Sequence, residues 1–183
     1  MKKKILETVS KNIENYGLKK ITLDLIASEL KISKKTIYKH FSSKDEMIKQ
    51  YIKEILENDK NSTILSVNED NLLNNKINNI IYSYHEYKLP TNVIEEIKMY
   101  YPDEWNLLNN LKEFKVQNII KLLEDARDNG EIRSDVDLNI VSLIIEKLSE
   151  ELLINSTLKK YNFKLNDGIN EVLDVILNGI LKK

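Results

Sequence analysis

The stretch ITLDLIASELKISKKTIYKHFSSKDEM, residues 21–47, decides the fold. Three of its hydroxyl residues, Thr22, Ser33 and Ser43, are each followed by residues with helical apolar spacing. The side-chain oxygen of such a residue accepts a hydrogen bond from a free amide in the first turn of a helix, so each predicts a helix N-terminus. The sequence therefore predicts two short helices in tight succession, followed by a longer one.

The second short helix, predicted over residues 34–41, has two different faces. Ile37 and Phe41 form an apolar side that is expected to pack against the neighbouring helices. The opposite side carries basic and hydroxyl side chains, namely Lys34, Lys35, Thr36, Lys39 and His40. This pattern suits the recognition helix of a helix-turn-helix, whose cations neutralise phosphates while its outward side chains reach base edges in the major groove.

The distribution of charge supports an anionic partner for this end of the chain. The formal net charge is only -1, but residues 1–50 hold 12 lysines against 6 acidic residues, and the remainder holds 16 basic against 23 acidic residues. A basic N-terminal third favours contact with nucleic acid. A solvated charged face is the alternative interpretation of the same charges.

The rest of the 183-residue chain is expected to be helical as well. Four glycines and two prolines leave little material for turns, and apolar residues recur at helical spacing. No cysteine is present, and no apolar run is long enough to span a membrane or form a secretory signal, so we expect a cytoplasmic protein. We predict a loop over residues 58–68 and about nine helices, spanning residues 3–16, 22–30, 34–41, 43–56, 70–87, 92–101, 102–129, 137–158 and 167–181.

Residues 21–48 resemble the DNA-binding segment of the TetR (tetracycline-repressor) family of bacterial regulators. The family pattern is matched in register by Thr22, Ile26, Ala27, Ile32, Ser33, Lys34, Thr36, Ile37, Tyr38, Phe41, Lys44 and Glu46. The resemblance covers about residues 3–55. Lys31 stands at the turn position where the family usually has glycine, and a positive φ there would cost on the order of 1 kcal/mol.

The resemblance implies a role for each matched polar residue. Thr22, Ser33, Tyr38 and Lys44 would contact DNA phosphates, and the five polar residues of the second short helix would lie in or beside the groove. Thr22 and Ser33 have the alternative of acting only as caps, Tyr38 of packing in the core, and His40 of being an exposed polar residue. The implied organisation is a helix-turn-helix domain over residues 1–46 and a helical effector-binding and dimerisation domain over residues 47–183.

The last two predicted helices carry more apolar residues than one chain's core requires. Two such helices from each of two chains would form a four-helix bundle, which is how TetR-like proteins dimerise; an entirely intramolecular core is the alternative. The predicted dimer interface consists of Leu138, Val141, Ile145, Leu148, Leu152, Ile169, Val172, Ile176 and Ile180. A dimer would place two recognition helices on a palindromic site.

A cluster of aromatic residues suggests a place for a small, mostly apolar molecule. Six of the 13 aromatic residues fall between residues 82 and 105. The predicted pocket consists of Tyr82, His85, Met99, Tyr100, Trp105 and Phe114. Ordinary core packing is the alternative for each of them. By family analogy, an effector bound between the central helices would shift the helix that begins near Ser43 and release DNA.

From these observations we expect a ligand-responsive regulator that acts as a repressor and binds a palindromic operator as a homodimer. The alternative is an all-helical protein-interaction or lipid-binding module with a basic N-terminal surface. An enzyme is not expected, because the two histidines are far apart in sequence and no nucleophile, phosphate-loop or dinucleotide motif is present. We therefore assign no catalytic residue, no metal site and no cofactor.

Overall fold

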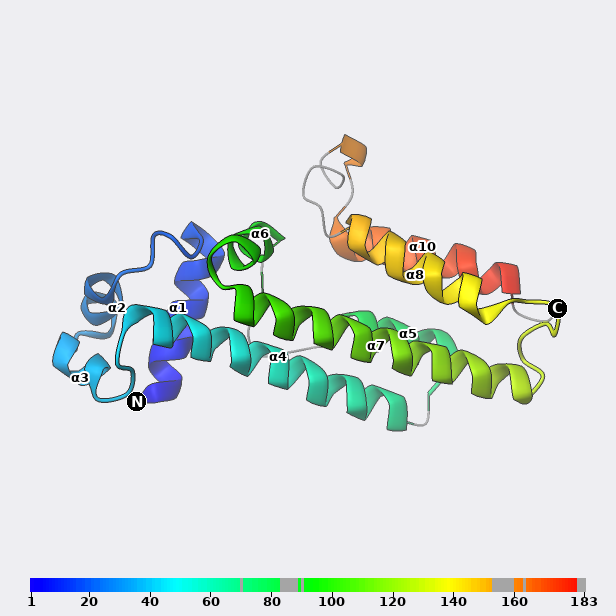
Figure 1. Cartoon of the computed structure of the whole chain (residues 1–183), viewed down its shortest axis with the longest axis horizontal. Coiled ribbons are helices and arrows are strands. Elements are labelled where there is room, and N and C mark those ends of the chain that lie inside the picture. The colour runs from blue at the N-terminus through cyan, green and yellow to red at the C-terminus, as the bar shows by residue number, and fades with distance from the viewer. Residues whose placement is uncertain (70, 83–88, 90, 153–159, 163, 181–183) are drawn as a thin grey trace. The chain divides into compact units, whose positions relative to one another are not determined.

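The computed structural model describes residues 1–69, 71–82, 89, 91–152, 160–162 and 164–180, and over these residues the regular structure is all-α. This confirms the predicted fold class. Figure 1 shows the helices in chain order. They are α1 (Lys2–Tyr16), α2 (Leu23–Leu30), α3 (Lys34–Tyr38), α4 (Lys44–Asn68), α5 (Leu73–Tyr82), α6 (Thr91–Tyr100), α7 (Pro102–Asp128), α8 (Leu138–Leu152) and α10 (Leu165–Ile180).

The chain divides into two compact units. Unit 1 consists of residues 1–58 and 85–109, and unit 2 consists of residues 59–84 and 110–183. Unit 1 therefore joins α1–α3 and the first half of α4 to α6 and the start of α7. The functional boundary after residue 46 stays a prediction.

Glycine and proline mark helix ends as the sequence predicts. Gly17 follows α1 with a φ of 78°, and its amide donates to the carbonyl of Ile13 at 2.9 Å. Pro102 is the first residue of α7, where its missing amide hydrogen costs nothing. Gly130 follows the end of α7, also with a φ of 78°. Gly17 and Gly130 thus mark the ends of α1 and α7, and Pro102 marks the start of α7.

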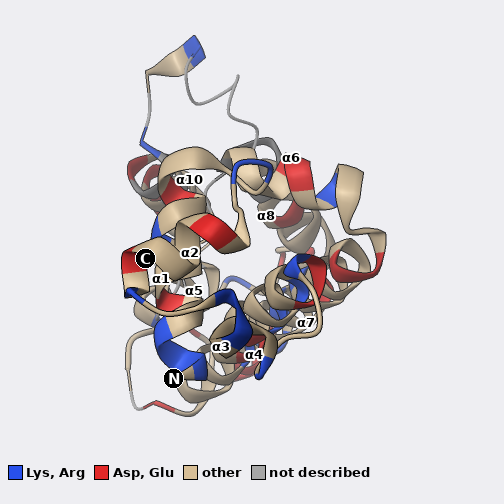
Figure 2. Ribbon diagram, turned by 90° about the vertical axis from the view of Figure 1, so that its left-hand side faces the viewer, with Lys and Arg blue, Asp and Glu red and all other residues tan. Residues whose placement is uncertain are grey.

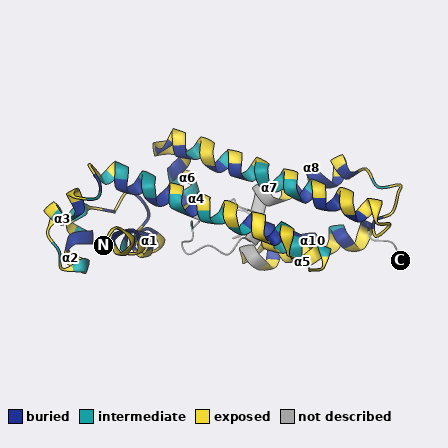
Figure 3. Ribbon diagram, turned by 90° about the horizontal axis from the view of Figure 1, so that it is seen from below, coloured by how far each residue is buried: buried dark blue, intermediate teal, exposed yellow. Residues whose placement is uncertain are grey.

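The core of unit 1 is built from one apolar face of each short helix. Figure 3 shows buried and exposed residues alternating along the helices. Ile37 of α3 and Phe41 just after it are 0% and 1% exposed, as their spacing predicted. They belong to a set of fully buried side chains that includes Ile5, Leu6, Ile13, Ile21, Ile26, Met47, Ile48, Tyr51 and Ile52. Burial of side chains of this size stabilises the fold by about 1.5–3 kcal/mol each.

The predicted loop over residues 58–68 is wrong, because α4 continues without a break to Asn68. The segment is rich in Asn, Ser and Thr, which compete with a helix by bonding to nearby backbone. In α4, hydroxyl groups of this segment donate to carbonyls of the preceding helical turn, so the helix continues. Thr63 Oγ1 donates to the carbonyl of Asp59 at 3.0 Å, and Ser66 Oγ donates to the carbonyl of Ser62 at 2.9 Å.

Unit 2 has a separate core formed by α5, the later part of α7, α8 and α10. Its buried residues include Ile77, Ile80, Ile119, Leu123, Leu173 and Leu177. Leu138, Val141, Ile145 and Ile180, which the sequence assigned to a dimer interface, also lie in this core and are at most 8% exposed. In this single chain all four side chains pack in the core of unit 2, and their part in a dimer interface stays a prediction.

The remaining predicted interface residues divide by their surroundings. Val172 and Ile176 are partly buried against the core of unit 2. The side chains of Leu152 and Ile169 lie outside the described residues. Leu148 is 37% exposed, and so are other apolar residues of α8, namely Ile140 (53%), Leu143 (48%) and Ile144 (40%). These four residues of α8 form an exposed apolar surface, here called the α8 surface.

Candidate nucleic-acid interface

The helix-turn-helix begins with two side-chain caps. Thr22 Oγ1 accepts a hydrogen bond from the amide of Leu25 at 3.1 Å, and Ser33 Oγ accepts one from the amide of Thr36 at 3.2 Å. The two caps confirm the predicted N-termini of α2 and α3. Both hydroxyl residues are exposed, and a hydroxyl oxygen that accepts from an amide can still donate its own hydrogen. Ser33 Oγ also lies 3.1 Å from Thr36 Oγ1, and in that hydrogen bond either hydroxyl can be the donor. A cap and a phosphate contact are therefore compatible in one residue.

Lys31 occupies the turn between α2 and α3 in the left-handed conformation, with φ 53° and ψ 42°. Its amide donates to the carbonyl of Ser28 at 3.1 Å, and the amide of Ile32 donates to the carbonyl of Ala27 at 3.0 Å. These bonds close α2 in the manner of a glycine-terminated helix. A lysine here carries the backbone strain that the sequence predicted for a positive φ.

The polar face of α3 is open to solvent. Lys34, Lys35, Tyr38 and Lys39 are exposed, and Thr36 and His40 are partly exposed. Figure 2 shows the basic residues gathered around α3 and the first turn of α1. Tyr38 is 53% exposed, so the structure does not place its ring in the core. The predicted helix 34–41 is shorter than expected, because α3 ends at Tyr38.

The start of α4 is closed by a third cap. Ser43 Oγ accepts from the amide of Glu46 at 3.0 Å, and the carboxylate of Glu46 accepts from the amide of Ser42. These bonds to Ser42 hold the pKa of Glu46 below its usual value. The partner amide is one residue earlier than an ordinary capping box uses. Lys44 is the first residue of α4 and is partly exposed, so its ammonium lies at the same end of the helix as the cap.

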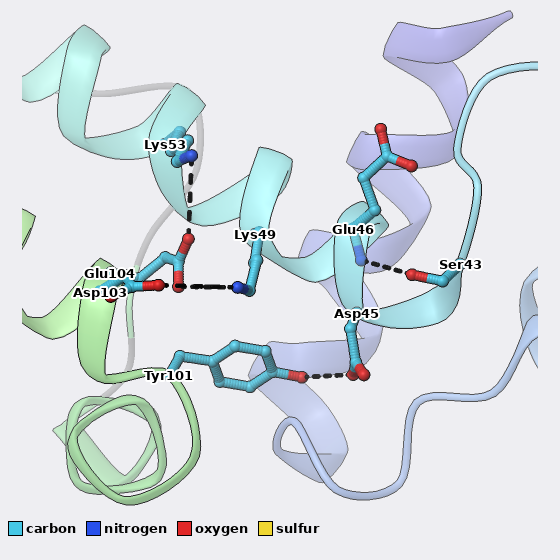
Figure 4. Close-up of polar contacts among 8 residues, drawn as sticks. All are labelled: Ser43, Asp45, Glu46, Lys49, Lys53, Tyr101, Asp103 and Glu104. Carbon is cyan, nitrogen blue, oxygen red and sulfur yellow. Dashed lines mark hydrogen bonds and ion pairs between the residues drawn. The ribbon is translucent and has the colours of Figure 1, made fainter.

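A contact that the sequence did not predict holds α4 against the junction of α6 and α7 (Figure 4). Tyr101, 8% exposed, donates a hydrogen bond from its hydroxyl to Asp45 at 3.2 Å. Burial first, and then the charge of Asp45, raise the pKa of this hydroxyl above its usual range. We call this contact, together with Glu104 and its lysines, the α4–α7 joint.

Glu104 is the charged residue of the joint. Its side chain is only 1% exposed, and its carboxylate oxygens lie 3.9 Å from the ammonium groups of both Lys49 and Lys53. Asp103, which is 83% exposed, lies 4.0 Å from Lys49. The acidic residues at the start of α7 are visible in the sequence, but their partners are 50 or more residues earlier in the chain. Spacing along one helix gives no signal for such a pair.

A second contact joins α6 to the turn after α1. The carboxylate of Glu96 accepts a hydrogen bond from the amide of Leu18 at 2.5 Å. A Cβ atom on Gly17 would lie 3.1 Å from the same carboxylate, so glycine suits this position for its size as well as its φ of 78°. Lys19 then places its ammonium 4.8 Å from the ring centre of Tyr100. The turn that follows α1 is thus fixed to α6 by two separate contacts.

The described structure places four of the six predicted pocket residues, three of them in unit 1 and Phe114 in unit 2. Met99 and Tyr100 are 71% and 44% exposed on α6, and the side chains of Tyr82 and His85 lie outside the described residues. Trp105 and Phe114 are partly buried, with the ammonium groups of Lys98 and Lys60 at 5.5 Å and 5.4 Å from their rings. The pocket therefore stays a prediction.

Each unit has a surface cavity lined by described residues. The cavity in unit 1, of about 540 Å³, is lined by Leu18, Lys19, Lys44, Asp45, Lys49, Tyr100 and Tyr101. The cavity in unit 2, of about 310 Å³, is lined by Asn74, Asn78, Asn170, Glu171, Leu173, Asp174 and Leu177. Tyr100 is the one residue of the predicted pocket that lines either cavity within the described part of the chain.

Neither a metal cluster nor a membrane-spanning helix is found in the part of the chain that the structure describes. Unit 2 does hold a buried ion pair. Lys115 Nζ lies 2.6 Å and 2.8 Å from the two carboxylate oxygens of Asp59, and both side chains are at most 16% exposed. Burial lowers the pKa of Lys115 despite the neighbouring carboxylate.

The family of this fold follows from comparison with known proteins. Residues 5–51 match the model of the tetR family of bacterial regulatory proteins, which is the segment that contains the three caps and α3. The chain is also 24% identical, over 191 aligned positions, to the HTH-type transcriptional regulator YvaF of Bacillus subtilis strain 168. That alignment covers 98% of this chain and 95% of YvaF.

Solved structures share the fold over 95% or more of this chain. A protein from Saccharomonospora viridis, described as a transcriptional regulator and solved in complex with choline, superposes with a TM-score of 0.78 at 19% identity, covering 100% of this chain and 98% of that one. The TetR-family regulator PfmR from Thermus thermophilus gives a TM-score of 0.68 at 17% identity, covering 95% and 97%. At these identities the likeness concerns the fold.

Proposed function

The chain belongs to the TetR family of bacterial regulatory proteins, and we propose that it is a ligand-responsive repressor that binds a palindromic DNA operator as a homodimer. One observation carries the proposal: two capped helices present an exposed basic face within the family's DNA-binding segment. Transcriptional regulation is the function of this family, and its members are not enzymes. Its regulators act on DNA in the cytoplasm, where we place this protein.

The DNA contacts divide into two kinds. Thr22, Ser33, Tyr38 and Lys44 supply hydroxyl and ammonium donors for phosphates, which position the protein without reading sequence. Lys34, Lys35, Thr36, Lys39 and His40 enter or border the major groove, where lysine and hydroxyl donors meet base edges. The exposure of the α3 side chains supports this division, and each lysine that neutralises a phosphate releases a counterion.

A homodimer is required for this mode of binding, because one five-residue recognition helix contacts few base pairs. The α8 surface supports association. Its four apolar side chains are each at least 37% exposed, while the opposite side of α8 is occupied by the core of unit 2. Pairing the α8 surfaces of two chains would remove this apolar area from water. The exposed Lys147 lies on the same side of α8, three residues after Ile144, with its ammonium 3.1 Å from Glu146.

A small molecule is the proposed input. Aromatic residues Tyr82, Trp105 and Phe114 remain the proposed pocket walls, with His85, Met99 and Tyr100 beside them. The structural relative from Saccharomonospora viridis was solved with choline, which makes choline a reasonable first compound, since quaternary ammonium groups bind aromatic rings. An effector releases DNA only if it binds the released state more tightly than the DNA-bound state.

The experiment that tests the proposal is selection of bound fragments from random duplex DNA, followed by affinity measurement on the selected sequence. We expect a palindromic sequence whose affinity exceeds that of random duplex by at least about a thousandfold at physiological salt. Lys35→Ala and Tyr38→Ala should weaken binding without changing helix content or dimer mass. Lys121→Ala, an exposed lysine of α7, is the matched control. Enrichment of no sequence would favour the protein-interaction or lipid-binding alternative.

A further inference from the structure

The recognition helix carries a lysine that is already paired within the protein. Lys34 Nζ lies 2.7 Å from Oδ1 of Asp24, and both side chains are well exposed, at 49% and 76%. Asp24 is in the first turn of α2, and Lys34 is the first residue of α3. The pair therefore connects the two helices of the helix-turn-helix at its surface. The hydrogen bond with Asp24 also raises the pKa of Lys34 above its usual value.

Both members of the pair are held in place by the fold. Thr22 caps α2 two residues before Asp24, and Ser33 caps α3 immediately before Lys34. The carboxylate also lies at the N-terminal end of α2, where the helix dipole favours a negative charge. An exposed ion pair contributes little to stability. Its main consequence is therefore for the charge that α3 presents to a partner.

We propose that Asp24 is a specificity-determining residue, which lowers the affinity of the recognition helix for arbitrary DNA by occupying Lys34. The inference rests on the proposed function. A phosphate that approaches Lys34 meets a neutral pair instead of a free cation, so it gains less energy and releases no net counterion at this position. Asp24 also brings a negative charge close to any phosphate that Lys34 contacts. Lys35 and Lys39 have no such acidic neighbour among the described ion pairs.

The consequence differs between specific and random DNA. On random duplex, binding depends on phosphate contacts, so the loss of one free cation lowers the affinity by the whole contribution of that cation. On the selected operator, base contacts contribute in addition. There Lys34 exchanges its hydrogen bond to Asp24 for one to a base edge, and the new bond offsets the cost of losing the old one. Asp24 therefore increases the ratio of the two affinities. Such a ratio, and not the affinity alone, decides occupancy in a genome with many competing sites.

The test compares Asp24→Asn with Glu29→Gln. Both changes remove one negative charge from α2, but Glu29 accepts a hydrogen bond from Asn12 at 2.9 Å and pairs with no lysine of α3. We expect Asp24→Asn to bind random duplex about 3–10-fold more tightly at low salt, and the slope of log K against log salt to steepen by about 0.9. The ratio of operator to random affinity should fall. Glu29→Gln should change each quantity much less.

A double variant separates the pair from a general charge effect. In a Lys34→Ala background, Asp24→Asn should alter neither the salt slope nor the random-duplex affinity beyond the change seen for Glu29→Gln. Circular dichroism of each variant checks folding, and Asp24→Ser provides a second neutral replacement. Equal effects of Asp24→Asn and Glu29→Gln, or an unchanged effect without Lys34, would overturn the inference. Wild-type protein that binds no duplex would instead contradict the proposed function, so the two failures are distinguishable.

Discussion

The hydroxyl of Tyr101 donates a hydrogen bond to Asp45 at 3.2 Å, although the two residues are 56 positions apart in the sequence. Asp45 follows Lys44 at the start of α4, and Tyr101 lies between α6 and α7. The bond therefore ties a proposed phosphate contact to helices outside the helix-turn-helix. Figure 4 shows Glu104 completing the same joint beside Lys49 and Lys53.

Removal of this hydroxyl should weaken the joint. Tyr101→Phe keeps the buried ring but loses the hydrogen bond, so we expect the free energy of unfolding to fall by about 1 kcal/mol. Tyr16→Phe, at a 54% exposed tyrosine that ends α1, is the matched control and should change it by less than about 0.5 kcal/mol. Urea denaturation of the three proteins measures both effects. Equal stabilities of Tyr101→Phe and wild type would mean that the bond contributes nothing.

Tyr101 should also make stability depend on alkaline pH. Its pKa is raised in the folded protein by burial and by Asp45, whereas an unfolded tyrosine loses its proton near pH 10. The folded state thus holds this proton more tightly, so the stabilisation is complete below about pH 10 and is lost as pH rises further. Between about pH 9 and about pH 11, wild type should lose more free energy of unfolding than Tyr101→Phe. Equal losses in wild type and Tyr101→Phe would contradict the assignment to Tyr101.

Lys31→Gly should stabilise the turn of the helix-turn-helix. The φ of 53° at this position is unfavourable for lysine and free of cost for glycine. We expect a gain of up to about 1 kcal/mol, reduced somewhat by the greater freedom of glycine in the unfolded chain. Lys39→Gly is the control, because Lys39 directly follows α3 with a φ of -70°, and there glycine should destabilise. Thermal unfolding of both variants gives the comparison, and a loss of stability in Lys31→Gly contradicts it.

The buried pair of unit 2 should be sensitive to the loss of one partner. Asp59→Asn leaves the ammonium of Lys115 buried without a counter-charge, so we expect a loss of about 3 kcal/mol. Adding Lys115→Met to this variant should recover most of the loss, because no buried charge then remains. Lys121→Met, on the exposed side of α7, is the control for the second change. A double variant no more stable than Asp59→Asn would contradict the interpretation that an unpaired buried charge causes the loss.

A charge on the α8 surface should separate the proposed dimer. Ile144 is 40% exposed, so Ile144→Glu is tolerated by a single chain but places a carboxylate in the proposed interface. We expect sedimentation equilibrium to show monomers and the palindrome to be bound much more weakly. Leu65→Glu, at a 65% exposed residue of α4, should leave the mass of the wild-type assembly unchanged. A stable Ile144→Glu dimer would place the interface elsewhere.

Local signals predicted most of the DNA-binding segment. The caps of Thr22, Ser33 and Ser43 each depend on residues within one helical turn, and so does the stop at Gly17. The continuation of α4 to Asn68 was missed, because helix propensity is low for a run of Asn, Ser and Thr, and tertiary packing overrides it.

Features that depend on tertiary packing could not be predicted. The apolar spacing of α8 fits two faces equally, and only the packing of α8 within the core of unit 2 shows that Val141 is buried and Ile144 is exposed. The bond between Tyr101 and Asp45 joins residues with no relation in spacing. The pocket residues proposed from the aromatic cluster also stay a prediction for this reason, because composition does not show which side chains lie close together in space.

The central claim is that two copies of the basic face of α3 read one palindromic duplex. The most direct test is a titration of the selected duplex with protein, in which the mass of the complex and the affinity are measured at several salt concentrations. We predict two chains per duplex, an affinity that falls steeply as salt rises, and a preference over random DNA that persists at each concentration. A single chain that binds no duplex even at low salt, or binding with no preference for the palindrome, would contradict it.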